Sequence, residues 1–266
     1  MHGEIYPIQP FFVNNTTRYY KKTVPCSPYV HFYSFTVDTA GTAFSAAVPD
    51  GSADMLFVSH NGRTEGYLYG FVTKSDGLHL QRGARCFGVR FRAGYLPERL
   101  GVSLPELVNS RVSLGDLPEC GPLVEKLAET SDFLERVKLL RGFVGERWRS
   151  HPLLQQLIDL VWDQGGAVRM LELEEQTLYS SRYINRVFND NLGLSPKTFA
   201  RYARFQRLIG MMNSSERFRL SGLASESGYF DQAHLSKEFK ELAGITPKEY
   251  LNMIDVDIYN QKIVYL

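Results

Sequence analysis

The chain lacks the features of membrane, secreted and disulfide-rich proteins. No apolar run approaches the length of a membrane span, because charged residues or glycines interrupt the longest ones. The N-terminal segment MHGEIYPIQP has no basic stretch followed by an apolar one, so we expect no secretory signal. Cys26, Cys86 and Cys120 are far apart and odd in number, which argues against a disulfide scaffold and a structural zinc site. These absences predict a cytoplasmic protein without a membrane partner.

Signatures of catalysis are missing as well. The sequence contains no G-x-S-x-G turn, P-loop or glycine-rich dinucleotide turn. His31, His60 and His79 are isolated from one another, so they predict no metal triad. Cys86 is the one candidate nucleophile, and a cysteine is more often a buried, inert residue than a reactive thiol. We therefore expect no enzyme, no catalytic residue, no cofactor and no metal ion.

Excess positive charge is scarce overall but concentrated in one segment. The whole chain has 266 residues and a net charge of +1. Between Tyr179 and Arg219, however, eight basic residues stand against two acidic ones, Asp190 and Glu216. A local basic stripe attracts phosphate even in a neutral chain, although a solvated helix face can look the same. The basic residues are Arg182, Arg186, Lys197, Arg201, Arg204, Arg207, Arg217 and Arg219.

The hydrophobic pattern changes its period along the chain. Up to about Val112, aromatic and β-branched segments alternate with period two, separated by the turn sequences DTAG, PDGS, HNGR and SDG. After Leu117 the period becomes 3.6, with a turn and cap at Thr130-Ser131-Asp132 between two helices. We predict an α+β protein: a β-rich barrel over residues 1–115, a helical connector over 116–150, an all-α domain over 151–255 and a tail over 256–266.

The all-α region contains an internal repeat. Two segments, Leu178–Phe199 and Gly228–Tyr250, share a polar cap, a helix with apolar residues on one face, and the ending G-[LI]-[ST]-P-K-x-[FY]. In that ending the glycine stops one helix, Ser195 or Thr246 caps the next, and the proline stands where no amide donor is needed. Together with the helices before them, the repeats predict two helix-turn-helix units.

This region resembles the paired helix-turn-helix domain of the AraC/XylS transcription regulators over about His151 to Met253. The second unit, LASESGYFDQAHLSKEFKELAGITPKEY, carries the family signature almost throughout. The first unit departs from it, because Glu174 stands in place of a small residue and Leu178 in place of the turn glycine. We therefore expect an irregular turn in the first unit.

The resemblance implies that the outward faces of two recognition helices contact DNA. Arginine can pair with guanine, and asparagine or glutamine with adenine, through two hydrogen bonds. In the first helix the expected contacts are Ser181, Arg182, Asn185, Arg186 and Asn189. In the second helix they are Gln232, His234, Ser236, Lys237 and Lys240.

A connector helix is expected between the units, over about Pro196 to Met212. Arg201, Arg204 and Arg207 follow one another along it at three-residue spacing. A helix of this length spans about 25 Å, which could place the two recognition helices about one DNA turn apart. We expect Arg201 and Arg204 to contact phosphates, unless they pair with the acidic residues Glu172, Glu174 and Glu175.

The N-terminal region resembles a domain found on many regulators of the same family. The segments that carry this resemblance are Pro49–Phe57 and Phe87–Leu117. In such proteins this half senses a small molecule, drives dimerisation or does both, and it is often a cupin-like barrel. Strand alternation nominates one ligand-binding face, whereas Arg90 and Arg92 lie on the opposite alternation and are expected to be structural or dimer-facing. The aromatic lining would be Phe57, Tyr67, Tyr69, Phe87 and Phe91.

Three hypotheses about function follow. The first is an effector-controlled transcription regulator that binds double-stranded DNA as a homodimer and can contact RNA polymerase. The second is a constitutive dimeric DNA-binding protein whose β-domain binds no ligand. The third is an enzyme with a DNA-binding tail, for which Cys86 would have to be the nucleophile. The helices over Gly121–Trp148 could form the dimer or seat the β-domain on the DNA-binding half, and the tail Val256–Leu266 could pack back or across a dimer.

Overall fold

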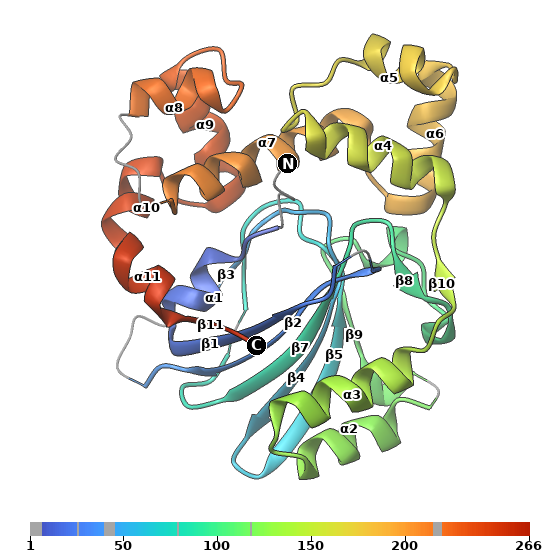
Figure 1. Ribbon diagram of the computed structural model, residues 1–266, viewed down its shortest axis with the longest axis vertical. Coiled ribbons are helices and arrows are strands. Elements are labelled where there is room, and N and C mark those ends of the chain that lie inside the picture. The colour runs from blue at the N-terminus through green and yellow to red at the C-terminus, as the bar shows by residue number, and fades with distance from the viewer. Residues whose placement is uncertain (1–6, 26, 40–45, 79, 118, 215–219) are drawn as a thin grey trace.

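The computed structural model describes residues 7–25, 27–39, 46–78, 80–117, 119–214 and 220–266. Its N-terminal part is built on strands and its C-terminal part on helices (Figure 1). A β-rich part followed by a helical one confirms the α+β class that the two hydrophobic periods predict.

A seven-stranded sheet in the order β11-β1-β2-β7-β4-β5-β9 forms the centre of the N-terminal part. Neighbouring strands are antiparallel, except that β11 runs parallel to β1. Because β11 takes the edge beside β1 and β9 lies at the other end, the sheet as described is open rather than closed into the expected barrel. Its strands are β1 (Thr16–Thr23), β2 (Tyr29–Val37), β4 (Asp54–His60), β5 (Arg63–Tyr69), β7 (Arg85–Phe91), β9 (Arg111–Ser113) and β11 (Ile263–Tyr265).

Short elements complete this part. Two small strand pairs lie beside the main sheet: β3 (Ala46–Ala47) with β6 (Asp76–Gly77), and β8 (Leu96–Pro97) with β10 (Trp148–Arg149). The short helices are α1 (Pro10–Asn14), η1 (Glu98–Leu100), η2 (Pro105–Leu107) and η3 (Leu114–Asp116). The turn predicted at HNGR joins β4 to β5, and both Asn61 and Gly62 have positive φ, as a tight hairpin turn requires.

Two helices, α2 (Gly121–Glu129) and α3 (Phe133–Val144), cover one face of the sheet (Figure 1). The predicted cap is confirmed, because the Asp132 carboxylate accepts a hydrogen bond from the Glu135 amide. The Phe133 ring packs edge-on against Phe87 of β7 at 5.9 Å. These helices therefore lie against the sheet, away from the C-terminal helices, and the expectation that they could seat the β-domain on those helices is wrong.

The C-terminal part consists of helices joined by short turns. Gly193 ends α6 and Gly244 ends α9 with φ of 74° and 76°, and a capped, proline-initiated helix follows each, so both predicted termination motifs are confirmed. The connector helix predicted over 196–212 is α7. The helices are α4 (Pro152–Asp163), α5 (Met170–Thr177), α6 (Ser181–Leu192), α7 (Pro196–Met212), α8 (Leu220–Glu226), α9 (Gln232–Ala243) and α10 (Pro247–Met253).

The tail returns to the N-terminal sheet. After α11 (Val256–Lys262), strand β11 pairs with β1, and the Leu266 amide donates to the Lys21 carbonyl at 3.0 Å. Lys262 donates from Nζ to the Asn14 carbonyl at 2.7 Å. Of the two arrangements expected for the tail, packing back on its own chain is the one found (Figure 1).

Helices α4 and α7 dock the C-terminal part on the N-terminal part. From α4, Asp159 forms an ion pair of 3.1 Å with Arg92, and Gln155 donates to the Ala93 carbonyl. From α7, the fully buried Gln206 hydrogen-bonds to backbone groups of the N-terminal part. The two parts therefore share a buried, specific interface.

Candidate functional site

A cavity of about 720 Å³ lies on the face of the sheet opposite to α2 and α3. Leu56 and Tyr67, which are register partners, line it, whereas Phe57 and Gly66 point toward α2. Its walls combine apolar side chains, such as Phe71, with charged ones. A cavity of this size and mixed lining can hold a small organic molecule with an apolar body and a polar group.

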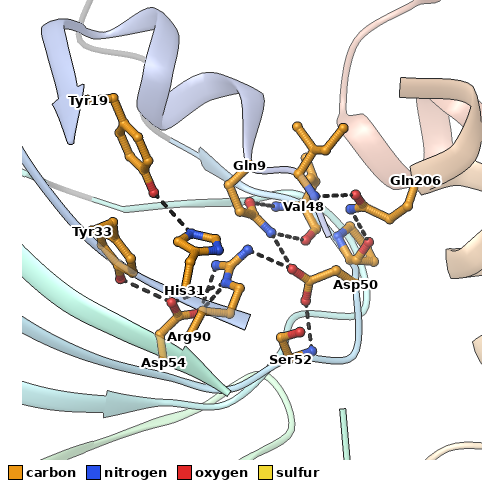
Figure 2. A network of polar contacts seen from close by, with 12 residues as sticks. Gln9, Tyr19, His31, Tyr33, Val48, Asp50, Ser52, Asp54, Arg90 and Gln206 are labelled. Carbon is orange, nitrogen blue, oxygen red and sulfur yellow. Dashed lines mark hydrogen bonds and ion pairs between the residues drawn. The ribbon is translucent and has the colours of Figure 1, made fainter. Parts of the chain in front are cut away.

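Three buried charged residues of the cavity wall form ion pairs (Figure 2). Arg90 donates from Nη1 to Asp50 Oδ2 and from Nη2 to Asp54 Oδ2, each at 2.7 Å. The Tyr33 hydroxyl donates to Asp54 Oδ1 at 3.0 Å, and the Ser52 amide donates to Asp50 Oδ1 at 2.8 Å. We call Asp50, Asp54 and Arg90 the buried triad.

The electrostatics of the buried triad follow from its burial. Burial raises the pKa of Asp50, and Arg90 opposes this rise. Burial by itself would lower the pKa of Arg90, but Asp54 and Asp50 outweigh it and raise that pKa, so the guanidinium stays charged. Sequence reasoning missed this triad. The available signal was a pair of opposite charges next to apolar runs, Asp54 at the start of β4 and Arg90 near the end of β7.

The five aromatic residues expected to line one pocket lie on both faces of the sheet. Tyr67 and Tyr69 line the cavity. Phe57, Phe87 and Phe91 point to the other face, where Phe87 meets Phe133 and Phe91 meets Trp148. The strand register is the reason, because Phe57 pairs with Gly66 and not with Tyr67. The expectation of one common lining is therefore wrong.

Arg90 of β7 and Arg92, which follows the strand, have different surroundings. Arg90 belongs to the cavity wall and is paired within the buried triad. Arg92 is partly exposed and pairs with Asp159 of α4. Both make structural ion pairs, and that of Arg92 joins the two parts of the chain.

The turn between α5 and α6 has a regular conformation in spite of its unusual residues. Leu178 adopts φ of 60° and ψ of 21°, a left-handed conformation like that of Gly228 at φ 81° before α9. The Glu174 carboxylate accepts a hydrogen bond from the Ser181 amide, and Ser180 caps α6. The irregular turn expected for the first unit is therefore absent, and a leucine carries the conformation that glycine has in the second unit.

Helix α6 buries one face and exposes the predicted polar one. Ile184, Val187 and Phe188 are buried, as the pattern predicts. Arg182, Arg186 and Asn189 are exposed, and Ser181 and Asn185 are half-buried. The Asn185 amide donates to the Ser181 carbonyl at 2.8 Å, and the Arg186 guanidinium lies 4.9 Å from the Tyr183 ring.

Helix α9 repeats this arrangement. Leu235 and Phe239 are buried, and the Asp231 side chain caps the helix. Gln232, Lys237 and Lys240 are exposed together with His234, whereas Ser236 is half-buried. His234 Nε2 lies 3.8 Å from Glu238 Oε2, so this histidine faces its own helix as well as solvent.

A groove of about 960 Å³ separates the two units, which stand side by side above the sheet in Figure 1. Its lining comes from α5, α6, α7 and α9 and includes residues expected to contact DNA on both units. Among the lining residues are Asn185, Lys197, Arg201, Arg204, His234 and Lys237.

A family model described as a helix-turn-helix domain matches residues 173–253, which include both units. The C-terminal part of the chain is a helix-turn-helix domain. A second model, a domain of unknown function (DUF6597), matches residues 24–113. No curated protein matches the chain.

Several solved structures are similar to this chain over all or part of its length. ToxT from Vibrio cholerae is 13% identical, with 84% of this chain and 98% of that chain covered and a TM-score of 0.46. The C-terminal domain of AraT, a response regulator from Geobacillus stearothermophilus, is 19% identical, with 39% and 87% covered and a TM-score of 0.37. A probable AraC family transcriptional regulator from Rhodopseudomonas palustris is 21% identical, with 38% and 96% covered and a TM-score of 0.36.

Within the helix-turn-helix domain, ion pairs tie α7 to α9. Arg201 Nε donates to Glu238 Oε2 at 3.0 Å and its Nη2 to Glu241 Oε1 at 2.9 Å. Arg204 Nη2 donates to Glu238 Oε1 at 3.1 Å, and its guanidinium lies 4.9 Å from the Tyr229 ring. The acidic partners expected for these arginines, Glu172, Glu174 and Glu175, are not the ones used. Sequence reasoning missed the buried Glu238, because its partners lie 34 and 37 residues away.

Neither a reactive thiol nor a metal site is found among the described residues. Cys86 is buried, and burial raises the pKa of its thiol to about 12. Across the described ranges, no cluster of His, Cys, Asp and Glu could hold a metal ion. No helix there is long and apolar enough to span a bilayer. Cys26, His79, Arg217 and Arg219 lie outside the described residues.

Proposed function

We propose that this chain is a transcription regulator that binds a specific DNA sequence through α6 and α9 and responds to a small molecule held in the cavity. The observation that supports DNA binding best is the pair of capped helices, each with a buried apolar face and an exposed polar one. An exposed helix of this kind inserts its N-terminal half into the major groove. Arg182, Arg186, Gln232 and Lys237 lie in those halves and are exposed.

The two arginines of α7 have a different role in this proposal. Arg201 and Arg204 already neutralise Glu238 and Glu241, so less of their charge is available to phosphates. We assign them to holding α9 on α7, and we assign phosphate contacts to the exposed Lys197 and Lys240. A charge that is already paired contributes little to the release of counterions from DNA.

Control by a small molecule is supported by the cavity of about 720 Å³. A protein whose β-rich part only dimerises needs no such space, which is why we favour an effector over the constitutive alternative. The effector would have to bind one arrangement of the two parts better than another. A homodimer would place two AraC-type domains on one DNA site, and the native mass of the protein–DNA complex would count the copies.

The test begins with selection of a preferred site from random DNA. Affinity for that site and for random DNA is then measured for the wild type, Arg186→Ala and Lys237→Ala. Loss of a base contact should cost about 1–3 kcal/mol on the selected site, a 5- to 150-fold weakening, and much less on random DNA. Lys126→Ala, an exposed lysine on α2, is the matched control and should bind like the wild type.

The outcomes separate the roles of the two units. If both variants lose affinity for the selected site but not for random DNA, base contacts from both helices are supported. Selective loss in Lys237→Ala alone would restrict base contacts to α9 and leave α6 as a contact to the DNA backbone. A wild-type protein that selects no sequence, with or without a small-molecule extract, would contradict the proposal.

A further inference from the structure

The segment at residues 48–52 belongs to the cavity wall and to the interface with α7. Val48, Asp50 and Ser52 line the cavity. Between them, the Pro49 carbonyl accepts a hydrogen bond of 2.9 Å from Gln206 Nε2 of α7. Gly51 has φ of +76°, and a Cβ on it would lie 2.6 Å from the Phe199 ring of α7. The segment therefore cannot move without disturbing α7.

Gln206 joins this segment to the start of the described chain. Its Oε1 accepts from the Ile8 amide at 2.7 Å, and the side chain is fully buried. The next residue, Gln9, donates to the Val48 carbonyl at 2.8 Å and to Asp50 Oδ2 at 2.9 Å. Figure 2 shows Arg90 bonded to Asp50 and Asp50 bonded to Gln9, while Gln206 bonds to backbone atoms on either side, the Ile8 amide and the Pro49 carbonyl.

A second wall segment, residues 70–78, touches both α7 and α9. Gly70, Phe71 and Asp76 line the cavity. The Thr73 carbonyl accepts from the Tyr202 hydroxyl of α7 at 3.3 Å. The Ser75 amide donates to the Leu242 carbonyl, at the C-terminal end of α9, at 2.7 Å. This segment therefore holds the end of α9 that points away from its N-terminal, base-contacting half.

A third segment, residues 105–111, does the same for α6. Asn109 and Arg111 line the cavity. A Cβ on Gly193, which ends α6, would lie 2.9 Å from Val108 and 3.0 Å from Pro105. Each helix assigned to DNA thus rests with its C-terminal end on a wall of the same cavity.

We propose that the three wall segments couple the cavity to the placement of α6 and α9, with Gln206 as the positioning residue of the link to α7. This inference rests on the proposed function. An occupant that fixes the walls would fix the two helix ends and the α7 axis between them. Because coupling between two sites is reciprocal, DNA bound to α6 and α9 must in turn change the cavity walls, even when no effector is present.

Reciprocity allows a test that needs no effector. Amide hydrogen exchange is measured with and without the selected DNA, and peptides covering residues 48–54 and 70–78 are followed. We expect DNA to slow exchange in both segments by about five-fold or more, the lower end of ordinary allosteric coupling. The segment at 48–54 is decisive, because Gly51, Ser52 and Asp54 are buried and DNA cannot cover them directly.

Variants assign the effect to particular bonds. Gln206→Leu should reduce the response at 48–54, where only the packing of Gly51 on Phe199 remains, and leave the response at 70–78. Tyr202→Phe, which removes one hydroxyl, should reduce the response at 70–78. The matched control is Gln261→Leu, since Gln261 is exposed on α11, lies outside the cavity lining and should leave both responses intact. If Gln206→Leu does not fold, Tyr202→Phe still tests the second link.

Two negative results have different meanings. DNA binding with unchanged exchange in both segments would overturn the coupling and leave the proposed function standing. A wild-type protein that binds no DNA would overturn both. A Gln206→Leu protein that responds like the wild type in both segments would remove Gln206 from the link.

Discussion

At the scale of single residues, Leu178 holds a conformation that suits glycine. Its φ of 60° is left-handed, and 91% of the residue is exposed, so no packing compensates the strain. A left-handed conformation costs an L-residue about 1–2 kcal/mol. Glycine avoids this cost, but it also makes the unfolded chain more flexible, which offsets part of the gain in stability. We therefore expect Leu178→Gly to raise the free energy of unfolding by about 0.5–1 kcal/mol, measured by urea titration.

The equivalent residue of the second unit provides the control for this prediction. Gly228 has φ of 81°, so Gly228→Ala should lower the free energy of unfolding by about 1 kcal/mol. If Leu178→Gly proves destabilising while Gly228→Ala behaves as expected, Leu178 must make a contact in solution that its exposure hides.

Lys21 makes the stability depend on pH. Burial lowers its pKa from 10.5 to about 8, so the folded state binds this proton more weakly than the unfolded state. The resulting penalty is complete below about pH 8 and decreases as the pH rises from 8 toward 10.5. Lys21→Met, which keeps the aliphatic stem, should therefore raise the free energy of unfolding by about 1–3 kcal/mol at pH 7.

The check is the same pair of proteins at two pH values. At pH 9.5 the wild-type lysine is largely neutral in the folded state, so the gain from Lys21→Met should be clearly smaller than at pH 7. A gain that is equal at both pH values would mean that the substitution acts through packing and not through the charge.

At the scale of elements, the tail is a structural part of the sheet. Strand β11 covers the edge of β1, and Tyr259 of α11 is buried. Deleting residues 256–266 would uncover that edge and lose the burial of at least one large side chain, about 2 kcal/mol. We expect the Tm to fall by about 4–8 °C and the protein to aggregate more readily, measured by calorimetry and light scattering.

A substitution of an exposed residue in α11 serves as the control for this deletion, because it alters the tail without removing buried side chains. Ile258 of α11 is half exposed, so Ile258→Ala should change the stability by less than about 0.5 kcal/mol. A deletion that left the Tm unchanged would show that β11 does not contribute to the sheet in solution.

Local sequence signals predicted the helical elements better than the sheet. The endings at Gly193 and Gly244 define their helices by chemistry within seven residues, and the 3.6-residue period identified the buried faces of α6 and α9. Strand alternation gave each strand two faces but could not give the register between strands, and so Phe57 was assigned to the face of Tyr67. The pairing of β11 with β1 and of Glu238 with Arg201 depends on residues distant in sequence, which no local pattern reports.

At the scale of the whole molecule, the two helix-turn-helix units are held at a fixed separation. Helix α7 has 17 residues and spans about 25 Å between them. The first unit is fixed through Gly193, which packs against Pro105 and Val108, and the second through the ion pairs of Glu238 with Arg201 and Arg204. Because this connection is rigid, we expect the two proposed recognition helices, α6 and α9, to meet the same face of DNA, about one helical turn apart.

This rigidity predicts strict dependence on the spacing within the selected DNA site. Inserting five base pairs between the two half-sites turns one of them to the opposite face, so the wild type should bind no better than it binds a single half-site. Glu238→Ala removes the carboxylate that both arginines of α7 share, and α9 should then adapt to altered spacing. We expect this variant to bind the original site more weakly and to lose less affinity from the insertion, measured by fluorescence anisotropy on both DNAs. Equal penalties in the two proteins would show that packing, and not the ion pairs, fixes the second unit, because removal of Glu238 would then leave the separation of the helices unchanged.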